Sequence, residues 1–167
     1  MTSNQLNNNT WICENCNNVV KADDEFCPEC GTLFIEEIFC NNHYDTLAEG
    51  VCIICSTPFC KKCGATVNNH FLCNHHINYE IYEGMVRVYG TLDDVTAQNA
   101  KTCLEQDRLH PVLFYRHQPK GGPRFVYNLF EAEGDYYGNI TNEIKVMVPT
   151  QEVLRAEEIL RSLKLKV

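Results

Sequence analysis

Two stretches near the start of the chain decide its fold: WICENC at residues 11–16 and FCPECGTLF at residues 26–34. Each holds two cysteines with two residues between them, and ten residues separate the two pairs. Two such pairs suit a structural tetrahedral zinc site with four thiolate ligands. A segment this short cannot bury enough apolar surface to fold alone, whereas bound metal supplies folding free energy directly. The predicted ligands are Cys13, Cys16, Cys27 and Cys30.

Other chemistry is open to these cysteines. They could pair as two disulfides, and CPEC at 27–30 has the spacing of a redox dithiol, although no β-α-β pattern surrounds it. In its W-x-C-x-x-C and F-C-P-x-C-G sequences the segment resembles the zinc-ribbon family, a likeness that implies a metal and names no partner. We expect a small core of four apolar side chains, with exposure of the tryptophan for stacking on a nucleic-acid base as the alternative. The four side chains are Trp11, Val19, Phe26 and Phe34.

A second set of ligand candidates follows as four pairs, each again with two residues between its members. Only four residues separate the second pair from the third. That gap is too short for these two pairs to close on one ion while the outer pairs meet each other. Interleaving is therefore expected, with the first pair joining the third and the second joining the fourth. The pairs are Cys40 with His43, Cys52 with Cys55, Cys60 with Cys63, and Cys73 with His76.

The sequences FCNNH, VCIIC, PFCKKC and FLCNHH resemble the B-box zinc-finger family, whose ligand pairs alternate in this cross-braced way. The last histidine stays open, because His70 is also near Cys73. We favour His76, since ATVNNHFLC at 65–73 looks like a hairpin with His70 in a turn that faces solvent. His70 and His75 would then be exposed imidazoles. The resemblance implies one ion on Cys40, His43, Cys60 and Cys63, and another on Cys52, Cys55, Cys73 and His76.

Cysteine density and charge divide the chain. Ten of the eleven cysteines precede residue 79. Residues 1–79 carry 3 Lys or Arg and 9 Asp or Glu, a balance of −6, whereas residues 80–167 carry 11 and 13, a balance of −2. Thiolate ligands would make the first half more negative still, and an acidic surface binds phosphates poorly. We expect a disordered tail at 1–10, a zinc ribbon at 11–34, a B-box-like finger at 38–78 and an α+β domain at 84–167.

The last part of the chain is predicted to form a small α+β sandwich with both helices on one sheet face. Helices are expected at 93–109, capped by Thr91 or Asp93, and at 151–163, capped by Thr150. Strands are expected at 84–90, 111–116, 124–130 and 143–149, with a short edge strand at 163–167. The predicted buried helix faces are Val95, Ala100, Cys103 and Leu104, and Val153, Ala156, Ile159, Leu160 and Leu163.

The sequences MVRVYGTLDD, AKTCLEQ and IKVMVPTQEVLRAEEIL resemble the prokaryotic signal-transducing domain, a family of unknown biochemical function related in fold to the nitrogen-regulatory PII proteins. The resemblance implies a ferredoxin-like or PII-like sandwich that senses a ligand or forms a homo-oligomer. Segment 117–142 departs from the pattern by its length. Its Lys120 and Arg124, with glycines between them, could contact a phosphate or nucleotide, but a solvated connection is the simpler interpretation.

We therefore expect a bacterial, cytoplasmic, non-enzymatic protein whose three structural zinc ions hold a surface for a protein partner. The first ten residues lack the basic and apolar regions of a signal peptide, and no run reaches the roughly 18 apolar residues of a membrane helix. The negative charge argues against the alternative of a nucleic-acid-associated zinc ribbon. A zinc-dependent enzyme would need an open coordination position, and a ubiquitin ligase would need RING ligands beyond the twelve residues already assigned.

Overall fold

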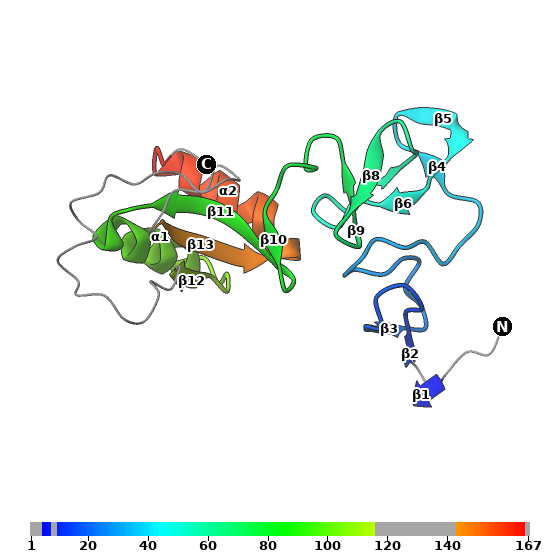
Figure 1. Ribbon diagram of the computed structural model, residues 1–167, viewed down its shortest axis with the longest axis horizontal. Coiled ribbons are helices and arrows are strands. Elements are labelled where there is room, and N and C mark those ends of the chain that lie inside the picture. Colours follow the sequence, from blue (N-terminus) through cyan, green and yellow to red (C-terminus); the bar gives the residue numbers. More distant parts are fainter. Residues whose placement is uncertain (1–4, 8–9, 116–142, 166–167) are drawn as a thin grey trace, which may run out of the picture. The chain divides into compact units, whose positions relative to one another are not determined.

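The computed structural model describes residues 5–7, 10–115 and 143–165 and divides into two compact units, Met1–Glu80 and Ile81–Val167 (Figure 1). The first unit is the cysteine-rich part of the chain and is built from short strands and turns. The second unit contains both α-helices and a four-stranded sheet. The predicted strand at 124–130 and the loop from Lys120 to Arg124 lie outside the described residues.

The first unit opens with a three-stranded antiparallel sheet of β1 (Gln5–Asn7), β2 (Thr10–Ile12) and β3 (Val19–Lys21). The Trp11 and Phe34 rings pack with centroids 4.3 Å apart, and Trp11 Nε1 donates a hydrogen bond to the Lys21 carbonyl at 3.0 Å. Trp11 is thus engaged within the unit. The small core also contains Cys13, Val20, Cys27 and Cys30.

One core prediction for this sheet is wrong. Val19 is 61% exposed, whereas Val20 is 2% exposed and lies opposite Trp11 in the β2–β3 pairing. Neighbouring residues of a strand point to opposite faces, so only one of two consecutive valines can enter the core. Phe26 is half-buried and forms an isolated bridge with Leu33.

Three two-stranded antiparallel sheets make the rest of the first unit. The ligand pairs lie at the ends of these strands or in the connections next to them, and each strand has only two to five residues. The three sheets are β4 (Phe39–Cys40) with β5 (His43–Leu47), β6 (Gly50–Val51) with β7 (Pro58–Phe59), and β8 (Gly64–Val67) with β9 (His70–Cys73).

The predicted ribbon segment, residues 11–34, docks on these strands through its second cysteine pair. The Phe71 amide donates to the Cys30 carbonyl at 2.9 Å, and the Val51 amide donates to the Gly31 carbonyl at 2.8 Å. Phe71 is 4% exposed, and glycines make room for it: a Cβ on Gly50 would lie 2.6 Å from its ring. The predicted ribbon and finger segments therefore share backbone hydrogen bonds and one buried aromatic ring.

The second unit has the sheet order β10-β11-β13-β12, with antiparallel pairing between all neighbours. Each helix contacts β11 and β13, and the two helices contact each other, so both cover the same face of the sheet. The strands are β10 (Ile81–Tyr82), β11 (Met85–Thr91), β12 (Val112–Tyr115) and β13 (Ile144–Pro149); the helices are α1 (Asp94–Gln106) and α2 (Val153–Ser162).

The core of the second unit is aliphatic. Alternate residues of β11, Val86 and Val88, are buried, whereas β13 has five consecutive buried residues, and small residues on the helices allow a close approach. The fully buried residues are Val86, Val146, Val148, Ala97, Leu104, Val153, Ala156 and Leu160.

The caps and buried faces of the two helices agree with the predictions only in part. Asp93 caps α1 as predicted, with its Oδ2 accepting from the Thr96 amide at 2.9 Å. Val95 does not belong to the buried face, since it is 66% exposed. Thr150 is not a cap: it is buried and starts a 3₁₀ turn, η1 (Thr150–Glu152), that precedes α2.

Two further predictions for the second unit need correction. Cys103 is only partly buried and lines an open groove between α1 and α2. The described residues of the predicted edge strand, 163–165, form a turn and no strand. The place next to β11 is taken by β10, which precedes it in the chain.

Candidate metal centres

Three groups of four cysteine and histidine side chains meet in the first unit. Within each group the ligand atoms all lie within 4.8 Å of one another. In the second and third groups, the first ligand pair meets the third and the second meets the fourth, which is the interleaved order. The groups are Cys13, Cys16, Cys27 and Cys30; Cys40, His43, Cys60 and Cys63; and Cys52, Cys55, Cys73 and His76.

The first group is made by two turns of the same kind. The Asn17 amide donates to the Cys13 carbonyl and the Gly31 amide donates to the Cys27 carbonyl, both at 2.8 Å. Asn17 and Gly31 have φ values of 61° and 79°, in the left-handed region that lets the chain reverse behind the cysteine pair. Each turn brings the two sulfurs of its pair to the same side of the backbone.

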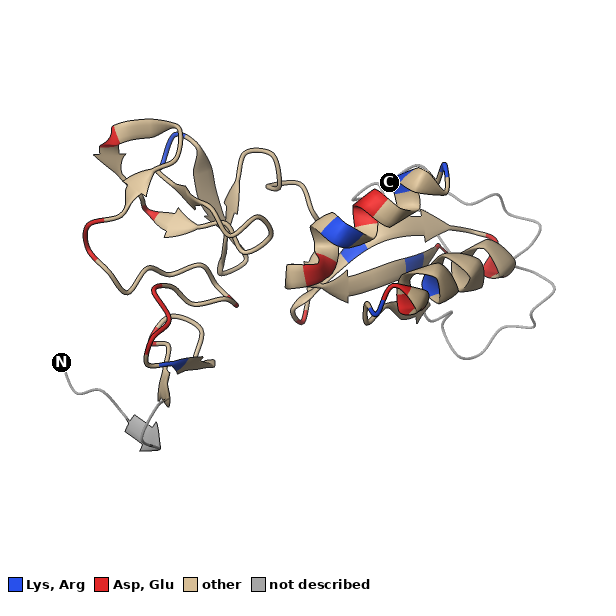
Figure 2. Cartoon of the chain, turned by 180° about the vertical axis from the view of Figure 1, so that it is seen from behind, with Lys and Arg blue, Asp and Glu red and all other residues tan. Residues whose placement is uncertain are grey.

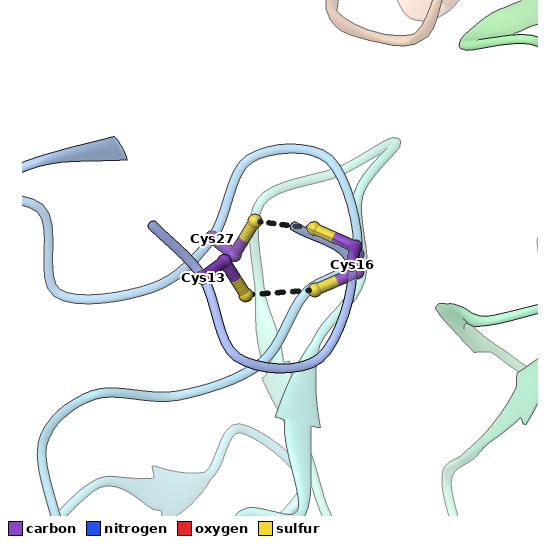
Figure 3. Close-up of side chains that lie close together, drawn as sticks. Cys13, Cys16 and Cys27 are labelled. Carbon is purple, nitrogen blue, oxygen red and sulfur yellow. Dashed lines mark hydrogen bonds between the residues drawn. The ribbon is translucent and has the colours of Figure 1, made fainter. Parts of the chain in front are cut away.

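The sulfur positions of the first group fit a tetrahedral ion. Cys13 Sγ lies 3.7 Å from Cys30 Sγ, and Cys16 Sγ lies 3.5 Å from Cys27 Sγ (Figure 3). A zinc ion bound to four sulfurs at about 2.3 Å sets neighbouring sulfurs about 3.7 Å apart, whereas a disulfide requires about 2.05 Å. All eleven cysteines of the chain are free thiols. The four side chains are therefore arranged as metal ligands and not as disulfides.

In the second group, His43 faces three sulfurs from the β4–β5 turn. Its Nδ1 lies 3.7 Å from Cys40 Sγ, 3.5 Å from Cys60 Sγ and 3.3 Å from Cys63 Sγ. Asn42, in the same turn, donates from its side-chain amide to Cys63 Sγ at 3.4 Å. The sulfurs are buried while His43 is exposed, so this group lies at the surface on its imidazole side.

The third group contains His76 and leaves His70 out. His76 Nδ1 lies 3.4 Å from Cys52 Sγ and 3.2 Å from Cys73 Sγ. Asn68 and Asn69, both with positive φ, form the β8–β9 turn, and His70 is the first residue of β9. The expectation of an exposed His70 is wrong, because its Nδ1 is buried and makes no hydrogen bond within the described residues. His75 is exposed.

Burial and hydrogen bonding shift the pKa values of different thiols in opposite directions in the metal-free protein. Burial raises the pKa of Cys27; the hydrogen bond to Cys52, together with burial, raises the pKa of Cys55. Burial acts in the same direction on Cys30, but hydrogen bonds, the strongest from Thr32, outweigh it and lower its pKa to about 7. The Cys55 hydrogen bond lowers the pKa of Cys52 to about 4. The first and third groups thus each pair a readily ionised thiol with one that keeps its proton until a cation displaces it.

Three polar side chains that the ligand spacing did not predict support the ligand sulfurs. Besides Asn42, the side-chain amide of Asn18 donates to Cys16 Sγ at 3.6 Å, and Thr32 Oγ1 lies 3.1 Å from Cys30 Sγ. Donors to a ligand sulfur disperse thiolate charge and fix the orientation of the ligand. Their positions in the sequence could have indicated this role, because each of these residues lies inside a ligand pair or within two residues of one.

The three groups are positioned to hold three zinc ions, and each presents a complete set of four ligands. Zinc in four-coordinate sites of cysteine and histidine is structural and cross-links the chain. No family model, curated protein or solved structure matches the chain. Over the described residues, neither helix has the length and apolar character needed to cross a membrane.

Proposed function

We propose that this chain is a zinc-binding, non-enzymatic interaction protein: three structural zinc ions hold the first unit as a surface for a protein partner, and the second unit senses a ligand or forms a homo-oligomer. The observation that carries this proposal is the completeness of the ligand groups, each with four side chains. A catalytic zinc site keeps one position open for water or substrate. Closed sites favour a scaffold over a metalloenzyme.

The packing within the first unit supports an interaction role. Phe71 connects the ribbon to the strands that carry the third group, and its amide is bonded to the carbonyl of a ligand of the first group, Cys30. The metals would thereby fix the whole unit and its exposed side chains. Trp11 is packed against Phe34 and hydrogen-bonded, which disfavours base stacking, and the acidic charge disfavours nucleic acid as the partner.

For the second unit we propose the ferredoxin-like, PII-like arrangement. Support comes from the order β10-β11-β13-β12, in which α1 connects the parallel strands β11 and β12 across β13. Fold likeness alone does not fix function, so the sensing role, like the bacterial and cytoplasmic setting, remains part of the proposal.

The test is zinc stoichiometry by elemental analysis of protein purified without added metal, combined with a thiol count after denaturation with chelator. We expect about three zinc ions per chain, from three groups, and eleven reduced thiols. One zinc or none, with thiols missing, would refute the scaffold. Turnover of a substrate that depends on added metal would favour an enzyme instead.

A further inference from the structure

The β4–β5 hairpin lies at the outer side of the first unit. β4 contacts β7 on one side and pairs with β5 on the other. β5 pairs only with β4 among the described strands, and all five of its residues, His43–Leu47, are exposed (Figure 1). The pairing joins Phe39 with Leu47 and Cys40 with His43. Residues 44–46 are therefore a bulge without partners on β4.

Large apolar side chains gather on this hairpin. Tyr44, in the bulge, is 79% exposed. Phe39 and Leu47, paired at its base, are 50% and 55% exposed. Tyrosine and other aromatic residues are the typical anchors of protein interfaces. We call Phe39, Tyr44 and Leu47, with the acidic residues around them, the hairpin patch.

Acidic residues outnumber basic ones around the hairpin patch. Residues 35–49 include four acidic residues and no lysine or arginine. The acidic residues are all exposed, and Figure 2 shows acidic segments beside this hairpin. Lys61 approaches from the β7–β8 connection, but it forms an ion pair with Glu49 at 3.4 Å. The four acidic residues are Glu36, Glu37, Asp45 and Glu49.

The hairpin patch is fixed by the second ligand group. Cys40 and His43, the residues that flank its two-residue turn, both belong to that group. Zinc bound there would hold the turn end of the hairpin against Cys60 and Cys63. An interface built on a restrained hairpin loses less conformational entropy on binding than one built on a free loop.

From these observations we propose that the hairpin patch binds a segment of a partner protein in which lysine or arginine residues flank an apolar centre. The apolar centre would cover Tyr44 and its neighbours, and the basic residues would lie against Asp45 and the acidic residues before β4. This inference rests on the proposed function, because it names the partner chemistry of the same zinc unit.

The test selects ligands from a displayed library of random linear peptides, with the zinc-loaded full chain as bait. The selected peptides are synthesised, and their dissociation constants are measured by fluorescence anisotropy. We expect peptides rich in lysine or arginine around apolar residues. Tyr44→Ser should weaken their binding by about tenfold or more, while Val19→Ser, which removes another exposed apolar side chain of the same unit, should leave binding unchanged.

Charge-reversal variants distinguish the effect of charges at the hairpin patch from the effect of the net charge of the protein. Asp45→Lys should weaken binding of the basic peptides by about tenfold, whereas Asp23→Lys makes the same charge change in the ribbon and should have much less effect. The proposal would be overturned if Asp45→Lys and Asp23→Lys weakened binding equally. It would also be overturned if the selection gave acidic peptides or no peptide at all. Self-association in sedimentation experiments that Tyr44→Ser abolishes would likewise overturn it, because a second copy would then occupy the patch.

Zinc content is measured on every protein sample used. Zinc-loaded wild-type protein that selects no basic, apolar peptide would refute the hairpin inference and leave the zinc scaffold standing. Protein that holds no zinc would refute the proposed function itself.

Discussion

At the scale of single residues, Gly31 has a φ of +79° and its carbonyl accepts the hydrogen bond from the Val51 amide. A Cβ at this position would lie 2.1 Å from the Val51 oxygen. Gly31→Ala therefore strains the backbone and forces the ribbon away from β6. We expect the variant to release zinc to a chelator about tenfold faster or more, which corresponds to the cost of such strain.

The control for Gly31→Ala is Gly84→Ala. Gly84 has a similar φ of +74° but belongs to the second unit. It carries the same conformational penalty for a side chain and should not change zinc release. If Gly31→Ala releases zinc at the wild-type rate, the docking of the ribbon on β6 does not stabilise the metal groups.

The two histidines near Cys73 give a second prediction at this scale. His76 contributes Nδ1 to the third group, whereas His70 lies outside all three groups. His76→Ala should lower zinc from about three ions per chain to about two, since three ligands bind the ion far more weakly than four. His70→Ala should keep all three ions, and His76→Cys should restore the third by supplying a thiolate. Zinc loss in His70→Ala with full zinc in His76→Ala would reverse the assignment.

At the scale of elements, the zinc affinity of the turns that carry the cysteine pairs is expected to depend on pH. Without zinc, thiols of the first unit hold protons at neutral pH: in the folded arrangement Cys27 and Cys55 have raised pKa values, and in an unfolded chain the pKa of a cysteine is about 8.5. Zinc-bound thiolates hold no proton. The metal-free state therefore binds more protons, so acid favours it and zinc affinity falls as pH falls. The expected change is about tenfold per pH unit for each proton displaced. Competition with a coloured chelator measures it, and an affinity independent of pH between about 6 and 8 would contradict it.

Elements whose signal is local could be predicted from the sequence. Ligand pairs with fixed spacing, the Asp93 cap and the partly alternating strand β11 are all encoded within a few neighbouring residues. Which residue of β3 enters the core could not be predicted, because Val19 and Val20 are equally apolar and the strand has only three residues. The start of α2 was misplaced because Thr150 has the chemistry of a cap but is buried. Docking of Gly31 on Val51 depends on residues twenty apart in the chain, and no local pattern reveals it.

At the scale of the whole molecule, the two units have different sources of stability. Cysteines make up much of the buried side-chain set of the first unit, and they are grouped so that bound metal ions would hold them in position. The second unit has an aliphatic core of its own between sheet and helices. Small domains that bury little apolar surface unfold when their structural zinc is removed, so chelation should affect the two units differently.

Two spectroscopic probes separate these responses. The single tryptophan, Trp11, lies in the first unit, and both helices lie in the second. On addition of a strong chelator, Trp11 fluorescence should shift to that of a solvated indole, while the helical circular dichroism signal stays unchanged. Cys13→Ser should give part of the same fluorescence change without chelator. Loss of the helical signal together with the Trp11 change would show that the second unit depends on the zinc unit for its stability, against the independent core described above.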